Sequence, residues 1–151
     1  MGVPGNARVA GRMTVYVSAR TDYAVRAMVS VAAEHPRLVK AAALATAQDI
    51  PLSFLHSILL DLRRAGLLYS QRGVDGGYQL TRPATEITVG DVVRAIGGAL
   101  TSVRGLPTGT ATYHGAATGL RDVWVAVEAA IEGVVDHTTL AELSDSAITT
   151  T

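Results

Sequence analysis

The chain has 151 residues, of which 48% are hydrophobic and 17% charged, and its formal net charge is zero. This length suits one compact domain, and so apolar a composition indicates a further surface buried between subunits. The absence of cysteine excludes disulfides, thiol switches, cysteine nucleophiles and every thiolate-ligated metal or cluster. Neither a membrane-length apolar run nor a signal peptide is found, so we expect a cytoplasmic chain with no membrane partner and a disordered tail at 1–12.

Charge is unevenly distributed along the chain. Residues 13–83 carry eight lysines and arginines against five acidic residues, whereas residues 84–151 carry three against eight. A basic front half indicates a polyanionic partner, although charge alone does not decide this. The histidines do not stand at metal-ligand spacing, so we expect no metal site.

The front half contains three predicted helices. The first, 23–33, has Ala24, Ala27, Met28 and Val31 on one face, and Ser18 or Thr21 is expected to cap its start. An alanine-rich helix at 40–48 and a turn at 49–51 precede an amphipathic helix at 51–65. The last helix has an apolar stripe of four residues, namely Leu55, Ile58, Leu59 and Leu62. The helices 40–48 and 51–65, joined by the turn, predict a helix-turn-helix. This signal is weak by itself, because such helix pairs also occur in ordinary protein cores.

A predicted hairpin strengthens this interpretation. Strand-like segments at 67–72 and 78–81 flank the glycine-rich turn 73–77. A hairpin directly after the second helix of a helix-turn-helix is the wing of a winged helix. Arg72 stands at the tip, where it can reach a phosphate or a narrow minor groove.

The back half predicts a helix for self-association. A capping box, Thr88 and Asp91, opens a helix that ends near Ile96, and a flexible loop follows at 99–117. A long apolar stripe then runs through residues 120–135, and we interpret it as a dimerisation helix, with packing inside the chain as the alternative. The stripe residues expected at the dimer interface are Leu120, Val123, Trp124, Val127 and Ile131.

These elements define the expected architecture. The fold class is mainly α with a small β-hairpin wing: a winged helix-turn-helix at 13–98 plus a long C-terminal dimerisation helix. The dimerisation helix and a short closing helix from about Thr139 to Leu143 occupy 118–145, and a disordered tail is expected at 146–151.

Several motifs resemble the Rrf2 family of bacterial winged-helix regulators, which includes iron–sulfur and nitric-oxide sensors. They are RTDYAVRA (20–27), IPLSFL (50–55), LRRAGLL (62–68), RGVDGGYQL (72–80), LRDVW (120–124) and TLAEL (139–143). The wing motif is the most specific, and the resemblance covers nearly all of 13–145.

The resemblance implies a set of DNA-contacting residues. The helix 51–65 would enter the major groove with its leading residues, Arg72 would enter the minor groove, and the start of the first helix would clamp the backbone. The implied contact residues are Arg20, Thr21, Tyr23, Ser53, Phe54, His56, Ser57, Arg63 and Arg72. Core positions remain alternatives for Phe54 and Tyr23, as does simple solvent exposure for Arg63 and Arg64.

The sequence departs from the cluster-binding members of that family. Those members carry three cysteines between the fourth helix and the long helix, whereas residues 103–119 contain none and Thr118 stands where the third would fall. Arg121 lies near the place of a non-cysteine ligand, and a guanidinium cannot ligate iron. We therefore expect no cofactor, and the cluster-sensing mechanism does not transfer.

The sequence thus predicts a homodimeric, sequence-specific regulator of double-stranded DNA, a repressor switched by a small ligand or a protein partner. The alternative is a winged-helix protein-interaction module that has lost DNA binding, against which the retained Arg72 and the basic front half argue. An enzyme has little support, because the sequence shows no paired carboxylates, no activated nucleophile and no phosphate loop.

Overall fold

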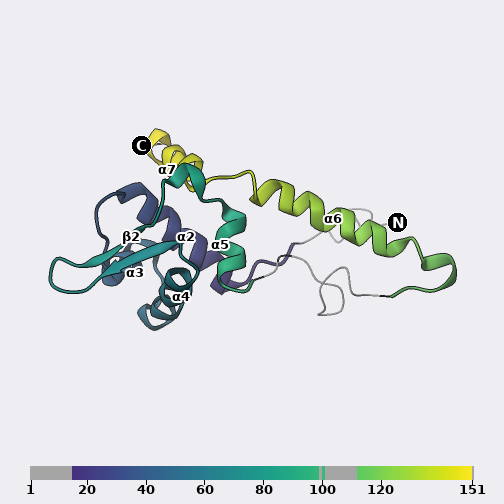
Figure 1. Ribbon diagram of the computed structural model, residues 1–151, viewed down its shortest axis with the longest axis horizontal. Coiled ribbons are helices and arrows are strands. Elements are labelled where there is room, and N and C mark those ends of the chain that lie inside the picture. Colours follow the sequence, from purple (N-terminus) through teal and green to yellow (C-terminus); the bar gives the residue numbers. More distant parts are fainter. Residues whose placement is uncertain (1–14, 99, 101–111, 151) are drawn as a thin grey trace, which may run out of the picture.

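The structure is a computed structural model that describes residues 15–98, 100 and 112–150. Within these residues a helical body carries a two-stranded hairpin, and a long helix extends away from the body (Figure 1). The predicted class, mainly α with a small β-hairpin wing and a long C-terminal helix, is therefore confirmed, while dimerisation through that helix stays a prediction. The tail expected at 1–12 and most of the loop expected at 99–117 lie outside the described residues.

Helix α2 (Ala19–Glu34) lies at the centre of the body and packs against α3, α4, α5 and α7. It begins earlier than the predicted Tyr23, because the Ser18 hydroxyl accepts a hydrogen bond from the backbone N–H of Thr21 at 3.1 Å. Ser18, not Thr21, is therefore the cap. The predicted apolar face is buried against the neighbouring helices.

Helices α3 (Ala41–Gln48) and α4 (Leu52–Arg64) form the helix-turn-helix. Asp49 reverses the chain between them with a φ of 52°, and Ile50 is buried beneath the turn. The whole predicted stripe of α4 is fully buried, which leaves the polar side of this helix facing outward.

Strands β1 (Leu68–Gln71) and β2 (Gly77–Leu80) form the antiparallel hairpin, with Leu68 opposite Leu80 and Gln71 opposite Gly77. The two leucines are buried and anchor the base of the hairpin in the core. An isolated bridge joins Val39 to Tyr78 through two backbone hydrogen bonds of 2.8 and 2.9 Å. This bridge, which the sequence did not predict, ties the wing to the segment before α3.

The C-terminal part packs back onto the body. The short helix η1 (Ala84–Glu86) leads to α5 (Val89–Ala95), whose predicted capping box is present. Helix α7 (Leu140–Thr150) packs against α2, with Leu140 fully buried. The closing helix is longer than predicted, and the segment expected to be a disordered tail is helical as far as Thr150.

Helix α6 (Leu120–Val135) follows η3 (Gly115–Ala117) and projects from the body at the end opposite the hairpin turn (Figure 1). None of its residues is buried within the chain. In the described part of the chain, no single helix is long and apolar enough to cross a membrane; α3 and α4 reach that length only together, and a bend of 118° separates them.

Candidate nucleic-acid interface

The outward face of α4 carries the predicted base-contacting residues. Ser53, His56, Ser57 and Arg63 are all exposed, because each lies off the buried apolar stripe. Their side chains are short or polar and carry groups that donate hydrogen bonds to base edges. These donors are therefore accessible to a ligand such as the base edges of a DNA groove.

Two aromatic residues lie beside this face. Phe54 is 55% exposed, so it is not a core residue, whereas Tyr23 is half-buried and packs against the core. Their rings meet edge-to-face, with centroids 6.4 Å apart and an interplanar angle of 70°. The Arg26 guanidinium stacks over the Tyr23 ring at 4.9 Å and donates to the carbonyl of Gln48 at 2.8 Å. This stack joins α2 to the start of α4.

The other two predicted clamp residues of α2 have different environments. Arg20 reaches α4, where it forms an ion pair with Asp61 and donates a 3.3 Å hydrogen bond to Ser57 Oγ. Thr21 is buried and accepts a hydrogen bond from the Ser18 hydroxyl at 2.9 Å. Its side chain does not reach the surface, so Thr21, contrary to the expectation, is not placed to contact DNA.

The wing presents Arg72 at the start of its turn, exposed to solvent. Gly76 makes this turn possible, since a Cβ atom there would lie only 2.1 Å from the carbonyl oxygen of Gln71. Lys40, which sequence analysis missed, donates to the turn carbonyls of Gly73 and Gly76 at 3.4 and 3.3 Å. Its place just before an alanine-rich helix gave no signal of this long-range contact.

Helix α4 and the wing hairpin line one shared groove. A hollow of about 340 Å³ lies between α4 and the hairpin, and both elements contribute side chains to it. Its lining includes His56, Arg63, Gln71, Arg72 and Tyr78. In the part of the chain that the structure describes, neither Arg63 nor Arg72 is paired with an acidic group. Two free guanidinium groups beside a polar helix face suit a phosphate backbone and the bases next to it.

The predicted dimer residues of α6 fall into two sectors. Val123 is 51% exposed, and Leu120 and Val127 face solvent on the same side. Trp124 and Ile131 are half-buried, and Ile131 lies toward α5. Val134, 67% exposed, continues the outward sector and was not among the predicted dimer residues. An apolar strip on a helix with no buried residue is typical of a subunit interface.

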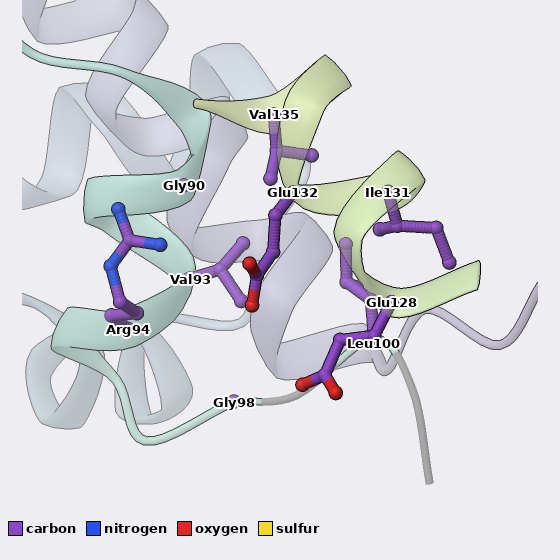
Figure 2. A pocket seen from close by; sticks show the side chains of 9 residues that line it. All are labelled: Gly90, Val93, Arg94, Gly98, Leu100, Glu128, Ile131, Glu132 and Val135. Carbon is purple, nitrogen blue, oxygen red and sulfur yellow. The ribbon is translucent and has the colours of Figure 1, made fainter. Parts of the chain in front are cut away.

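A cavity of about 190 Å³ separates the inner side of α6 from α5 (Figure 2). Val93 of α5 and Ile131 and Val135 of α6 provide apolar walls, and the carboxylates of Glu128 and Glu132 lie on the α6 side. The cavity lies where the projecting helix meets the winged helix.

An ion-pair chain closes one side of this junction. Arg94 of α5 pairs with Asp136, just beyond α6, at 2.7 Å and with Asp91 at 3.4 Å, and Arg82 lies 3.7 Å from Asp91. Burial raises the pKa of Asp91, but hydrogen bonds from Thr88 and Arg94 outweigh it, so the net pKa is lowered. The hydrogen bond to Asp136 raises the pKa of Arg94. This series of ion pairs thus connects the end of the wing, α5 and the end of α6.

A helix-turn-helix followed by a hairpin, with a polar helix face and free arginines on one groove, defines a winged-helix DNA-binding protein. Residues 17–146 match the model of the Rrf2 family, described as an iron-dependent transcriptional regulator. The chain is also 47% identical over 133 residues to Rv1287 of Mycobacterium tuberculosis, assigned as an HTH-type transcriptional regulator, covering 87% of this chain and 83% of that one.

Solved structures agree with this match. CymR of Bacillus subtilis, described as its global cysteine regulator, superposes with a TM-score of 0.73 at 26% identity, covering 88% of this chain and 98% of that chain. IscR of T. potens gives a TM-score of 0.70 at 30% identity, with coverages of 92% and 90%. The chain therefore belongs to the Rrf2 family, and it is a DNA-binding transcriptional regulator rather than an enzyme.

The donor set of this chain does not fit the iron chemistry that the family description implies. The sequence contains no cysteine to supply thiolate ligands. Nor do the described residues bring together three or more histidine, aspartate or glutamate side chains that could hold a metal ion.

Proposed function

We propose that the chain is a homodimeric transcriptional repressor that binds a roughly twofold operator through α4 and the wing. The observation that carries this proposal is the shared groove, where the polar face of α4 and the unpaired Arg63 and Arg72 lie together. In this arrangement α4 enters the major groove and the wing follows the adjacent backbone or minor groove. The proposal places the protein in the cytoplasm, where its DNA is.

The contacts divide by type. Ser53, His56 and Ser57 lie on the exposed face of α4 and read base edges. All three can donate hydrogen bonds, and the two short serine side chains let the helix approach closely. Arg63 and Arg72 meet phosphates or the minor groove and supply salt-dependent affinity. The exposed ring of Phe54, supported by Tyr23, makes apolar contact at the helix start.

Two subunits associate through the outward strip of α6. Burying Val123, Val127 and their neighbours against a second copy removes from water an apolar surface that the chain itself leaves uncovered. Trp124 borders this strip and joins the interface at its edge. The dimer then presents two recognition helices, as a twofold operator requires.

The regulatory switch is a small ligand or a partner protein that acts on α6 and the loop 99–117. Support comes from the cavity between α5 and α6, which lies between the proposed dimer helix and the DNA-binding body. A ligand that changes how α6 sits on α5 alters the spacing of the two recognition helices.

The test starts from genomic DNA of the source organism. Fragments retained by the purified protein are sequenced, and the recovered site is compared with its scrambled sequence in gel-shift titrations. We expect binding at least about a thousandfold tighter to the recovered site. If neither DNA is bound, the alternative takes precedence: a winged-helix protein-interaction module that has lost DNA binding.

A further inference from the structure

One arginine of α2 makes two contacts with the recognition helix. One terminal nitrogen of Arg20 pairs with the carboxylate of Asp61, and the other donates a 3.3 Å hydrogen bond to Ser57 Oγ. Both acceptors belong to α4, one helical turn apart, so a single guanidinium spans them. The Arg20 and Asp61 side chains are 33% and 34% exposed, which places the pair at the edge of the DNA-facing surface.

The ion pair changes the electrostatic role of Arg20. A carboxylate on a DNA-facing helix repels phosphate, and a neighbouring arginine normally attracts it. Here the two charges neutralise each other within the protein. Arg20 is therefore not a free cation like Arg63 or Arg72, and it does not present itself as the phosphate clamp that the family resemblance implied.

The hydrogen bond changes what Ser57 can offer to a base. A serine hydroxyl has one hydrogen to donate and two lone pairs that accept. Arg20 donates to one lone pair, and its positive charge draws electron density from the oxygen, so the hydroxyl becomes a weaker acceptor and a stronger donor. The Ser57 side chain is otherwise exposed, which leaves its O–H free to point toward DNA.

We infer that Arg20, held by Asp61, is a positioning residue that sets Ser57 as a hydrogen-bond donor and so determines which bases the recognition helix accepts. This inference rests on the proposed function, in which α4 lies in the major groove. The base edge facing Ser57 then carries an acceptor: N7 or O6 of guanine, N7 of adenine, or O4 of thymine. Cytosine, which offers only its N4 amino donor, is rejected there.

The experiment uses the full-length protein and five variants: Ser57→Ala, Arg20→Ala, Asp61→Ala, the double variant of Arg20 and Asp61, and Glu34→Ala as a matched control. Glu34 also pairs with an arginine, Arg37, but lies at the far end of α2. Dissociation constants are measured on the recovered operator and on every single base-pair substitution, at several salt concentrations. Ser57→Ala first identifies the base position that Ser57 reads. Thermal unfolding checks each fold, and Asp61→Asn replaces Asp61→Ala if the alanine variant is unfolded.

In the unmodified protein and in Glu34→Ala, we expect cytosine at that position to weaken binding about tenfold, the effect of one good base contact. Arg20→Ala loses this discrimination. It also leaves the Asp61 carboxylate unpaired beside the phosphates, so the salt slope is judged from the double variant, which lacks both charges. Asp61→Ala loses the discrimination too, but the freed Arg20 now binds phosphate and steepens the slope of log K against log salt by about 0.9. The double variant returns the slope to its original value.

Three results would overturn the inference. One is an Arg20→Ala variant that flattens the salt slope by about 0.9 and keeps the rejection of cytosine, which makes Arg20 an ordinary phosphate clamp. Another is a steepened slope that persists in the double variant. The third is an Asp61→Ala variant that changes neither discrimination nor slope. In each case the unmodified protein still binds its operator specifically, so the proposed function stands; its own failure is the absence of specific binding by that protein.

Discussion

Single backbone positions decide where the wing presents Arg72. Gly76 lies within the turn, and the site of its missing Cβ is occupied by the backbone of Gln71 and Arg72. A backbone obstacle cannot move aside as a flexible side chain can. We predict that Gly76→Ala distorts the turn and weakens DNA binding at least tenfold, with the midpoint of thermal unfolding reduced by only a few degrees, since the core is untouched. Val74→Ala, a change at an 88% exposed position of the same turn, is the control and retains binding.

Residue roles were predictable from the sequence only where they depend on local pattern. The exposed face of α4 follows from helical periodicity, which separates Ser53, His56 and Ser57 from the buried leucines. The burial of Thr21 and the pairing of Arg20 with Asp61 do not follow, because they depend on how α2 packs against segments distant in the chain. The two ion-pair partners are 41 positions apart in the sequence. Sequence periodicity carries no information on such pairings.

At the scale of single elements, α5 depends on its first turn. Thr88 Oγ1 accepts from the backbone N–H of Asp91 at 3.1 Å, and the Asp91 carboxylate accepts from the N–H of Thr88 at 3.0 Å. Loss of such a cap typically costs about 1 kcal/mol. We predict that Thr88→Ala lowers the free energy of unfolding by about that amount, measured by urea titration. Thr85→Ala, within η1 and outside the capping box, leaves the free energy within a few tenths of a kcal/mol.

Asp91 also makes the stability depend on pH. Its folded pKa lies below the ordinary value of 3.8, so the ionised carboxylate stabilises the fold above that value and the contribution is lost as pH falls through the lowered pKa. We predict that the stability difference between the unmodified protein and Asp91→Asn shrinks as the pH falls below about 4. Urea titrations from about pH 7 to about pH 3 measure it. A difference that stays constant across this range would show that the charge of Asp91 plays no part.

The apolar residues of helix α6 form two sectors, although their periodicity predicted a single surface. The apolar stripe was predicted as one surface, but it is wide enough for two: Ile131 and Val135 face α5, and Val123 and Val127 face outward. Packing within the chain and packing between subunits were posed as alternatives, and the structure assigns the inner sector to the first. Its outer sector remains for the proposed dimer.

A charge on the outer sector tests the dimer. We predict that Val127→Asp, which buries a carboxylate in the proposed interface, converts the dimer to a monomer at micromolar concentration, measured by sedimentation velocity. Val125→Asp is the matched control, because Val125 is 39% exposed, close to the 38% of Val127, but lies off the stripe. An unmodified protein that is monomeric at this concentration, or equal behaviour of both variants, would contradict the proposed interface.

Helices α3, α4, α5 and α6 and both strands were predicted closely because each carries its own local signals, whereas α2 begins earlier and α7 ends later than predicted. Periodicity placed α4, capping residues placed α5, and glycines placed the turn of the wing. What could not be predicted are the Val39–Tyr78 bridge and the full length of α7, which depend on how distant segments meet. These features form only when segments distant in the sequence pack together.

At the scale of the whole molecule, the chain keeps the regulator architecture of its family without the ligands for a thiolate-held cluster. We predict that protein purified without oxygen is colourless, with no visible absorbance from a cluster, because iron–sulfur clusters are held mainly by cysteine thiolates. Absorption spectra and iron and sulfide analyses test this. Stoichiometric iron and sulfide would show that other side chains hold a cluster.

The proposed DNA-binding surface and the proposed dimer surface lie at different ends of the molecule. The hairpin turn lies at one end and α6 projects at the other, so a second copy can join α6 without covering the wing (Figure 1). Such a dimer is expected to prefer half-sites about one helical turn of DNA apart. The proposed function rests above all on one claim: α4 reads the base sequence, while the wing supplies affinity that does not depend on sequence.

That claim is tested most directly by titrating the unmodified protein, His56→Ala and Arg72→Ala on operator and scrambled DNA at two salt concentrations. We predict that His56→Ala costs about 1–3 kcal/mol on the operator and much less on scrambled DNA. Arg72→Ala should weaken binding to both DNAs alike and reduce the salt slope by about 0.9. If both variants lose the same affinity on both DNAs, the division between the recognition helix and the wing is wrong.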